Sequence, residues 1–413
     1  MLELLKQREA EGKPIRVGLI GAGAMGVGIA WQIARTPGMT LAFVGDIKRS
    51  ALDAAKKAFE PYENPVLTED CFGALAGANA IDIDVLVEGS NTIGPAAKYC
   101  LAAIDQGAHC VLMNAEVDLA LGKLLNHEAA KKGVIVTSDA GDQHGVLATM
   151  MEEIEMWGFR LVQAGNIKGF LDRYKTATDL IGEAAKRNLD PVQCCAYTDG
   201  TKLNVEMALV SNGFGMVPFK PGMEGPACKD VTEVLNLFDF DAYPESGCVD
   251  YILGAQPGGG VYVVGHCDDP IQQPYLTYYK LAEKPPYYLF YRPYHLCHLE
   301  TPRAIAKAVL YGEPVLTPKR GRVADVYAYA KADVAAGTVV QHGIGGDEFY
   351  GIIESCAGSD AAGQVPISLL EGEGAAKPKV LADKKKDEPL TFGEVELPDT
   401  LLHQLYAEQS KLA

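Results

Sequence analysis

The sequence contains no apolar run that approaches the ~18 uncharged residues needed for a helix to span a bilayer. It also lacks an excess of basic residues: 37 lysines and arginines stand against 54 aspartates and glutamates, a net charge of −17. A nucleic-acid surface needs a dense basic face, so binding to a phosphate backbone is excluded as the main task. Anionic membrane surfaces are disfavoured for the same reason.

No Cys-x-x-Cys pair occurs among the ten cysteines. This pattern predicts reduced, buried thiols rather than a zinc site or a disulfide framework. The stretch Met1 to Ala10 mixes acidic and basic residues and lacks the apolar core of a signal peptide, so we expect a cytoplasmic protein. The length of 413 residues, with 48% hydrophobic and 22% charged residues, suits two or three globular domains.

The most informative stretch is an apolar run, residues 15–20, that stops at a Gly-x-Gly-x-x-Gly turn and continues as helix-like residues 27–34. Gly21 allows the tight turn, Gly23 lets the backbone approach a pyrophosphate, and Gly26 lets the helix pack close to the strand. The helix N-terminus adds N–H groups and a partial positive charge for the phosphates. The sequence therefore predicts a dinucleotide site formed by Gly21, Gly23, Ala24, Met25 and Gly26.

A second apolar run, residues 41–45, ends at Asp46, about twenty residues beyond the turn, where a carboxylate would hold an adenosine ribose. Asp46 would repel a 2′-phosphate and favours NAD, whereas Lys48, Arg49 and Ser50 are neighbours that accommodate NADP. The two cations and the hydroxyl could bind a 2′-phosphate together, whereas the single carboxylate of Asp46 could rotate away from it. We therefore favour NADP as the cofactor and keep NAD as the alternative.

Apolar and helix-like segments alternate as far as residue 137, which predicts an α/β fold with a Rossmann, doubly wound parallel sheet. We assign this dinucleotide-binding domain to residues 1–145. The regular alternation of strands and helices ends before residues 146–318. We expect this segment to form a second α+β domain for substrate binding and dimerisation, and we expect helix 302–311 to return to the first domain. Residues 319–413 are short-stranded and punctuated by glycine, which predicts a small β-rich module and a C-terminal tail.

Four stretches together resemble the homoserine-dehydrogenase-like oxidoreductases: Gly21 to Gly26, Val85 to Ser90, Gly107 to Asn114, and the helix that ends at Lys131-Lys132-Gly133. This resemblance implies that Ser90 and Asn114 lie beside the nicotinamide end of the cofactor. Homoserine dehydrogenases carry Asn-Lys where this chain has Asn114-Ala115-Glu116, so homoserine is not the expected substrate.

Residues 330–340 resemble a SAF domain, whose signature is a residue pair before Ala-Gly-Thr-Val-Val. A homoserine-dehydrogenase-like core followed by a SAF module resembles one lineage in particular. That lineage includes enzymes described as similar to 1-deoxyxylulose-5-phosphate reductoisomerase.

Hydride transfer to or from a carbonyl carbon needs a positioned acid or base for the proton on oxygen. Our preferred candidate is Lys202. If Asp199 is the N-cap, Lys202 occupies the third helical position, where the helix dipole opposes its charge and favours proton donation. Glu206, one turn later, lies on the same face and could pair with it. The alternative is an exposed lysine on a solvated helix face.

Lys168 follows an apolar strand and could bind an anionic substrate group or share the acid–base work, with an ordinary loop lysine as the alternative. Asp139, Asp142 and His144 leave the sheet at its carboxyl edge, where they could contact substrate or a divalent metal, or simply shape turns and caps. The segment 292–300, read as a strand, would point its histidines to opposite faces, so we assign no metal ligands.

These patterns together predict an NAD(P)-dependent oxidoreductase acting on a small, polar, anionic hydroxy or keto substrate, with or without a phosphate group. Lys202 would donate or accept the proton, Asp199 and Glu206 would orient it, and Lys168 would contact the substrate. One alternative is a reductoisomerase, which would need a divalent metal. The other is a non-catalytic, nucleotide-sensing binding protein. By analogy we expect a homodimer through the middle domain, with no nucleic-acid or membrane partner.

Overall fold

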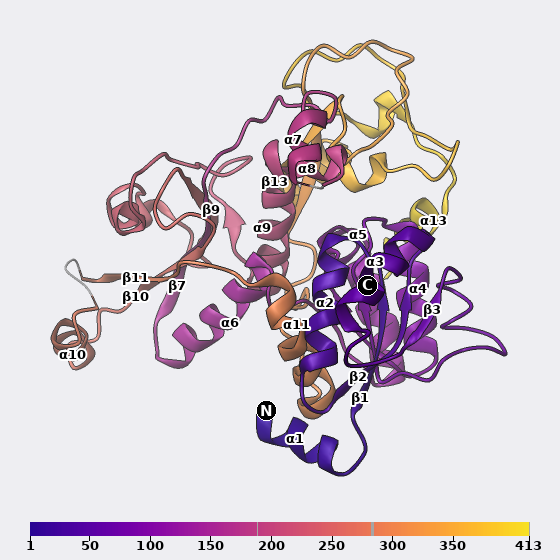
Figure 1. Cartoon of the computed structure of the whole chain (residues 1–413). Helices are drawn as coiled ribbons and strands as arrows, with labels where there is room; N and C mark the ends of the chain where they lie inside the picture. Colours follow the sequence, from indigo (N-terminus) through magenta and orange to yellow (C-terminus); the bar gives the residue numbers. More distant parts are fainter. Residues whose placement is uncertain (188, 282–284, 413) are drawn as a thin grey trace. The chain divides into compact units, whose positions relative to one another are not determined.

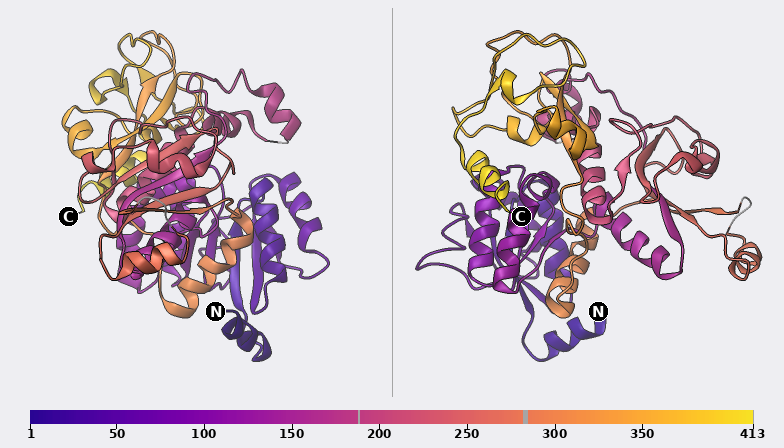
Figure 2. Two further views of the ribbon diagram at one scale, coloured as in Figure 1. Left: turned by 90° about the vertical axis from the view of Figure 1, so that its left-hand side faces the viewer. Right: turned by 180° about the vertical axis from the view of Figure 1, so that it is seen from behind.

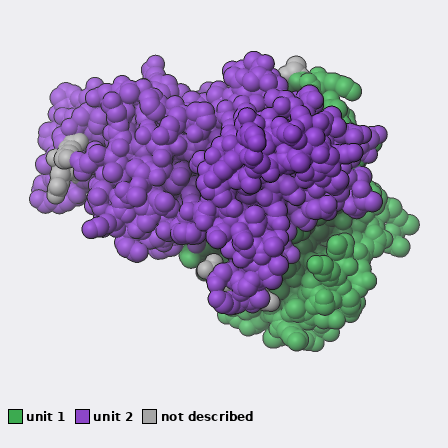
Figure 3. Space-filling model, turned by 90° about the horizontal axis from the view of Figure 1, so that it is seen from above, with its two compact units in different colours: residues 1–145, 296–317, 400–413 green, residues 146–295, 318–399 purple. Residues whose placement is uncertain are grey.

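The computed structural model describes residues 1–187, 189–281 and 285–412. The chain divides into two compact units, which Figure 3 colours separately. Unit 1 comprises residues 1–145, 296–317 and 400–413, and unit 2 comprises residues 146–295 and 318–399. Within the described ranges, no helix is both long and apolar enough to cross a membrane.

Unit 1 contains a six-stranded parallel sheet with the strand order β3-β2-β1-β4-β5-β6 (Figure 1). Its strands are β1 (Ile15–Ile20), β2 (Met39–Gly45), β3 (Val66–Thr68), β4 (Val85–Glu88), β5 (His109–Leu112) and β6 (Val136–Ser138). The order reverses at β1 and β4, and folds of this kind bind ligands outside the carboxyl ends of the strands at that point. The predicted doubly wound α/β fold is confirmed.

Four helices connect these strands: α2 (Ala24–Arg35), α3 (Arg49–Phe59), α4 (Gly94–Asp105) and α5 (Ala115–Lys132), and α1 (Leu2–Ala10) precedes the first strand. The core beneath α2 is fully buried, with Val17 and Leu19 of β1 packed in the same cluster as Ile29 and Ile33. This burial follows from the apolar faces of the strand and helix, which alternate with periods of two and of about 3.6 residues.

Two later segments of the chain complete unit 1. Helix α11 (Cys297–Ala306) packs against α2 and continues into the π-helical turn η3 (Lys307–Tyr311). Helix α13 (Leu401–Gln409) packs against α4 and α5 (Figure 2). Gln409 joins α13 to α5 through two hydrogen bonds. Its Oε1 accepts from Leu124 N at 2.9 Å, and its Nε2 donates to Ala120 O, one turn earlier in α5, at 2.8 Å.

Unit 2 is built on a five-stranded mixed sheet with the order β11-β10-β7-β9-β8. Its strands are β7 (Arg160–Lys168), β8 (Val217–Pro218), β9 (Cys248–Leu253), β10 (Val261–His266) and β11 (Tyr287–Arg292). The central strand β7 pairs antiparallel with β10 and parallel with β9. A buried cluster that includes Ile167, Ile252 and Tyr262 covers one face of the sheet, together with η1 (Val231–Asn236) and η2 (Phe240–Ala242).

The other elements of unit 2 are mostly short. They are α6 (Gln143–Met156), α7 (Ile181–Arg187), α8 (Pro191–Thr198), α9 (Thr201–Phe214), α10 (Gln272–Tyr278), β12 (Ala324–Ala330), β13 (Phe349–Ser355), α12 (Cys356–Ala361), η4 (Ile367–Leu370), β14 (Lys379–Val380), η5 (Phe392–Glu394) and β15 (Val395–Glu396). β12 pairs antiparallel with β13, and β14 pairs antiparallel with β15.

Helix α9 holds the C-terminal β-strands to the rest of unit 2. Thr201 Oγ1 accepts from Gly351 N at 2.9 Å, and Asn204 Oδ1 accepts from Ile353 N at 2.8 Å. Asn212 Oδ1 accepts from the N–H groups at the start of β12. We expected residues 319–413 to form a third module. The short strands expected there are present as the pairs β12–β13 and β14–β15. Residues 318–399 belong to unit 2, where α9 supplies acceptors to β12 and β13, and residues 400–413 belong to unit 1.

Candidate functional site

The glycine turn between β1 and α2 has the geometry of a phosphate-binding loop. Gly21 adopts φ 96°, and a Cβ on it would lie 2.5 Å from Gly89 O. A Cβ on Gly26 would lie 1.8 Å from Gly21 O, so only glycine allows α2 to start this close to the strand. Gly23 is the N-cap of α2, and nothing lies within 4 Å of a Cβ placed there.

Ala24 and Met25 open helix α2, so their N–H groups belong to the first turn, which has no acceptors inside the helix. The open space at Gly23 and the positive end of the helix dipole lie at the same place. A pyrophosphate would find both donors and favourable charge there.

Asp46, directly after β2, is fixed beside this turn. Its Oδ2 accepts from Ala22 N and its Oδ1 accepts from Lys48 N, both at 2.8 Å. Arg49 points its Nε at Asp53 Oδ1, 3.1 Å away on the next turn of α3. The carboxylate of Asp46 is therefore held by two backbone donors, while the guanidinium of Arg49 has an acidic partner of its own.

Ser90 and Asn114, which come from separate stretches of the sequence, both contact Thr92. Asn114 Nδ2 donates to Thr92 O at 2.7 Å, and Ser90 Oγ lies 3.2 Å from Thr92 Oγ1. Asn114 also caps α5, where its Oδ1 accepts from Val117 N at 3.2 Å. Glu88, the last residue of β4, is fully buried and accepts from Ser90 N at 3.0 Å, and burial raises its pKa to about 7.

Buried acidic groups continue along this edge of unit 1. Ser138 Oγ donates to Asp118 Oδ2 at 2.5 Å, and Gly141 N donates to Asp139 Oδ1 at 2.6 Å. Burial raises the pKa of Asp118 to about 6 and that of Asp139 to about 7. His144 is 1% exposed, and among the described residues neither of its ring nitrogens has a hydrogen-bond partner. Buried carboxyl groups with raised pKa values, such as Asp118 and Asp139, are common at functional sites.

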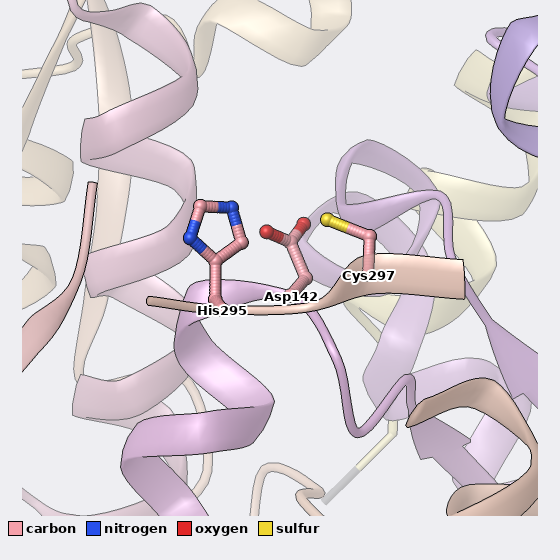
Figure 4. Close-up of side chains that lie close together, drawn as sticks. All are labelled: Asp142, His295 and Cys297. Carbon is pink, nitrogen blue, oxygen red and sulfur yellow. The ribbon is translucent and has the colours of Figure 1, made fainter. Parts of the chain in front are cut away.

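Asp142 and Cys297, both in unit 1, bring potential ligand atoms within 4.8 Å of each other (Figure 4). His295, drawn with them, is the last residue of its segment of unit 2, where its Nδ1 lies 2.6 Å from Gly259 O. The predicted strand over residues 292–300 is wrong, because β11 ends at Arg292 and α11 begins at Cys297. A carboxylate and a thiol alone do not complete the ligand set of a metal site.

In unit 2, three polar side chains from β7 and α9 meet. Asn166 and Lys168 are two residues apart on β7 and so point to one face of the sheet. Asn166 Nδ2 and Lys168 Nζ both donate to Glu206 Oε2, at 2.7 and 3.2 Å. The side chain of Glu206 is 5% exposed and that of Lys168 is 19% exposed. A buried carboxylate therefore fixes an ammonium group that solvent still reaches, which is a suitable arrangement for a proton donor.

Lys202 lies at the start of α9 in a different setting from the one we predicted. The N-cap of α9 is Gly200, at φ 86°, so Lys202 occupies the second helical position rather than the third. Its Nζ lies 3.3 Å from Gln193 Oε1, 3.4 Å from Tyr197 OH and 4.7 Å from the centroid of the Tyr197 ring. Glu206 is paired with Lys168, 38 residues earlier in the chain.

Asp199, which we expected to orient Lys202, instead pairs with Lys331 inside unit 2. Asp199 Oδ2 lies 2.9 Å from Lys331 Nζ, and the two side chains are 0% and 1% exposed. The same ammonium has three further neighbours: Gly346 O at 2.6 Å, Lys175 O at 2.7 Å and Cys195 Sγ at 3.1 Å. Asp199 therefore has Lys331, and not Lys202, as its ion-pair partner within unit 2.

Sequence reasoning passed over Asn166, although its spacing from Lys168 was a usable signal. Residues i and i+2 of a strand share a face. An amide two positions before a candidate lysine is therefore a natural companion for it. Lys331 gave no comparable signal, because its partner Asp199 lies far away in the chain.

Residues 141–301 match the family model described as the catalytic domain of oxidoreductase DRL. The matched segment contains β7, α8 and α9, and with them Asn166, Lys168, Lys202 and Glu206. This segment is therefore similar to an oxidoreductase catalytic domain. No curated protein sequence matches the chain. The resemblance of residues 330–340 to a SAF domain stays a prediction.

Several solved dehydrogenase structures are similar to this chain at low sequence identity. A probable dehydrogenase from Thermotoga maritima is 13% identical, with a TM-score of 0.45, and the match covers 75% of this chain and 92% of that one. A homoserine dehydrogenase from Thiobacillus denitrificans is 16% identical, with a TM-score of 0.45 and coverage of 83% and 91%. The myo-inositol dehydrogenase from Lactobacillus casei, in complex with NAD(H) and myo-inositol, is 17% identical, with a TM-score of 0.36 and coverage of 61% and 71%. At these TM-scores we assign no residue role and no substrate from them.

Proposed function

We propose that the protein is an NAD-dependent oxidoreductase that interconverts a carbonyl and an alcohol on a small, polar, anionic substrate. The observation that carries this proposal is the phosphate-binding geometry of the turn Gly21 to Gly26 with Asp46 beside it. The match of residues 141–301 to an oxidoreductase catalytic domain supports the class of reaction.

The setting of Asp46 favours NAD over NADP, the cofactor that the sequence pattern favoured. The sequence argument allowed Asp46 to rotate away from a 2′-phosphate. Two backbone hydrogen bonds at 2.8 Å oppose that rotation, and a fixed carboxylate would repel the phosphate and accept from a 2′-hydroxyl. Arg49, a candidate phosphate partner, is engaged with Asp53.

Lys168 is the proposed proton donor, and Glu206 and Asn166 are its positioning residues. A nicotinamide cofactor, when bound, would provide the hydride for the carbonyl carbon. The ammonium of Lys168 gives one proton to the oxygen, so that a carbonyl becomes an alcohol and Lys168 becomes a neutral amine. Because Lys168 remains 19% exposed, water can return the proton. The positive charge of Lys168 also favours an anionic substrate group nearby.

The two candidate lysines can be separated by matched variants. We expect Lys168→Met to lower kcat by at least a hundredfold, since general acid–base catalysis contributes about 10²–10⁴-fold. Lys202→Met is the control for loss of a lysine from the same unit, and we expect it to change kcat by less than about tenfold, a difference of 1.36 kcal/mol in activation free energy. Asn166→Asp, which places a second carboxylate beside Glu206, should shift the pH profile of kcat without loss of NADH binding.

The assay is oxidation of NADH and of NADPH, followed at 340 nm over a panel of keto acids, keto sugars and sugar phosphates, each at about 1 mM, the upper end of ordinary KM values. Turnover with NADH on at least one anionic carbonyl compound is the expected result. Tight NADH binding with no turnover on any panel member would instead favour the nucleotide-sensing alternative. A large loss of kcat in Lys202→Met but not in Lys168→Met would move the proton donor to α9.

We also propose a homodimer formed through unit 2. Strand β11 lies at the edge of the five-stranded sheet, and an exposed edge can pair with another chain. Nearby in the sequence, Tyr275, Tyr278 and Tyr279 are 56%, 77% and 68% exposed, an unusual density of exposed aromatic surface. Light scattering at micromolar concentration tests this, and a monomer mass for the full chain would contradict it.

A further inference from the structure

Unit 1 contains a pocket built from residues that take no part in the glycine turn or in the Asp46 region. It lies between the segment that follows β3, helix α4 and helix α13, and it has a volume of about 470 Å³. Its lining residues are Phe72, Leu75, Ala76, Gly77, Ala80, Lys98, Leu101, Ala102, Asp105, Gln106, Leu401 and Leu405. The volume falls within the 300–1,000 Å³ that is usual for small-molecule sites.

Most of the pocket wall is apolar and firmly held. Leu75 and Leu405 are 2% and 8% exposed, so each is anchored in unit 1 while it faces the pocket. Leu401 and Leu405 are one turn apart on α13 and so present a continuous apolar stripe. Gln106 Nε2 donates to Leu75 O at 3.0 Å, which ties the segment after β3 to the end of α4. The wall is therefore set before any ligand arrives.

The pocket carries one positive charge that no acidic group offsets. Lys98 Nζ lies 4.0 Å from the centroid of the Phe72 ring, and within the described ranges no carboxylate lies within ion-pair distance of it. Asp105, the acidic residue of the lining, is paired with Lys132 at 3.1 Å. In a chain with a net charge of −17, an uncompensated lysine beside an apolar pocket is a specific feature.

We propose that this pocket binds a small amphipathic anion, an unbranched apolar chain of medium length that ends in a single carboxylate. The carboxylate would pair with Lys98, and the apolar chain would lie along Leu75, Leu101 and Leu405. Two physical terms support this occupant: burial of the chain against apolar walls at about 25 cal/mol per Å², and charge complementarity with the unpaired ammonium. The proposal does not depend on the reaction proposed for the enzyme.

Octanoate is the probe, with octan-1-ol as a neutral ligand of the same chain length, both titrated calorimetrically into the full-length protein. We expect one saturable octanoate site per chain, and weaker binding of octan-1-ol. Lys98→Met should weaken octanoate binding about fivefold, the effect of an ion pair of about 1 kcal/mol, and should leave octan-1-ol binding unchanged. Lys57→Met, which removes an exposed lysine from α3 outside the pocket, is the matched control and should alter neither.

Two variants fill the pocket: Leu101→Trp on α4 and Ala76→Phe on the segment after β3. Either one, if it retains NADH binding as evidence of a folded unit 1, should abolish binding of both probes. Absence of saturable octanoate binding to the unmodified protein overturns the proposal. So does binding that persists unchanged in both filled variants. Equal affinity for octanoate and octan-1-ol, unaltered by Lys98→Met, removes the anionic group from the ligand and likewise refutes the proposal as stated.

Discussion

Replacing Lys331 by methionine should destabilise unit 2 more than any surface substitution in it. Methionine has nearly the same length, so the main change is loss of the ammonium group. That loss leaves the carboxylate of Asp199, which is fully buried, without its cation. It also leaves the carbonyl groups of Lys175 and Gly346 with only the weak thiol donor of Cys195. Breaking a buried ion pair by removing one partner costs about 3–5 kcal/mol.

The assay is urea denaturation of the full-length protein, followed by a signal from unit 2 such as the fluorescence of Trp157. Lys385→Met is the matched control, because Lys385 makes an ion pair with Asp333 at 2.7 Å on the exposed surface and should leave the midpoint unchanged. The double variant Lys331→Met with Asp199→Asn should recover part of the loss, since no buried charge remains. A loss below about 1 kcal/mol in Lys331→Met would refute the reasoning, because it would show that Asp199 does not need its cation.

Three further predictions follow from the site and the fold. Asp46→Ser should lower the ratio of kcat/KM with NADH to kcat/KM with NADPH at least tenfold, because it removes the carboxylate that repels a 2′-phosphate. Burial raises the pKa of Asp139 from 3.8 to about 7 in the folded protein. Its protonated form therefore stabilises the fold fully below pH 3.8, and this stabilisation is lost as pH rises through 7. Between pH 4 and pH 8 the unmodified protein should therefore lose up to about 4 kcal/mol of unfolding free energy that the Asp139→Asn variant does not lose, as measured by urea titration at each pH. Asn204→Leu should cost about 1–3 kcal/mol, since it leaves the N–H of Ile353 buried without an acceptor, and hydrogen exchange at that amide should speed up accordingly.

The fold of unit 1 was accessible from sequence because its signals are local. The run from Ile15 to Gly26 contains a strand, a turn and a helix start in consecutive residues, and the alternation that follows predicts a parallel sheet. In unit 2 the decisive contacts join distant residues. Glu206 meets Lys168 because a helix packs on a strand, and no periodicity in either segment specifies which lysine a glutamate will face.

The boundary of the C-terminal region shows the same limit. The short strands and glycines of residues 319–413 predict a small β-rich module and a tail, and short strand pairs do occur there. The side chains that attach this region belong to α9, where Thr201, Asn204 and Asn212 look like ordinary helix residues in the sequence. Their role appears only once the amide groups of β12 and β13 are known to face them.

The contact of Gln409 with helix α5 has a consequence for shortened forms of the chain. A messenger with a premature stop before residue 409, or a protease that trims the end, would leave all six strands of the nucleotide-binding sheet intact. Such a product would nevertheless lose the Gln409 side chain, which forms hydrogen bonds with Leu124 N and Ala120 O of α5. Ala120 and Leu124 are 1% and 2% exposed, so loss of α13 would uncover this face of α5, and we expect proteases to cleave α5 faster in the shortened chain.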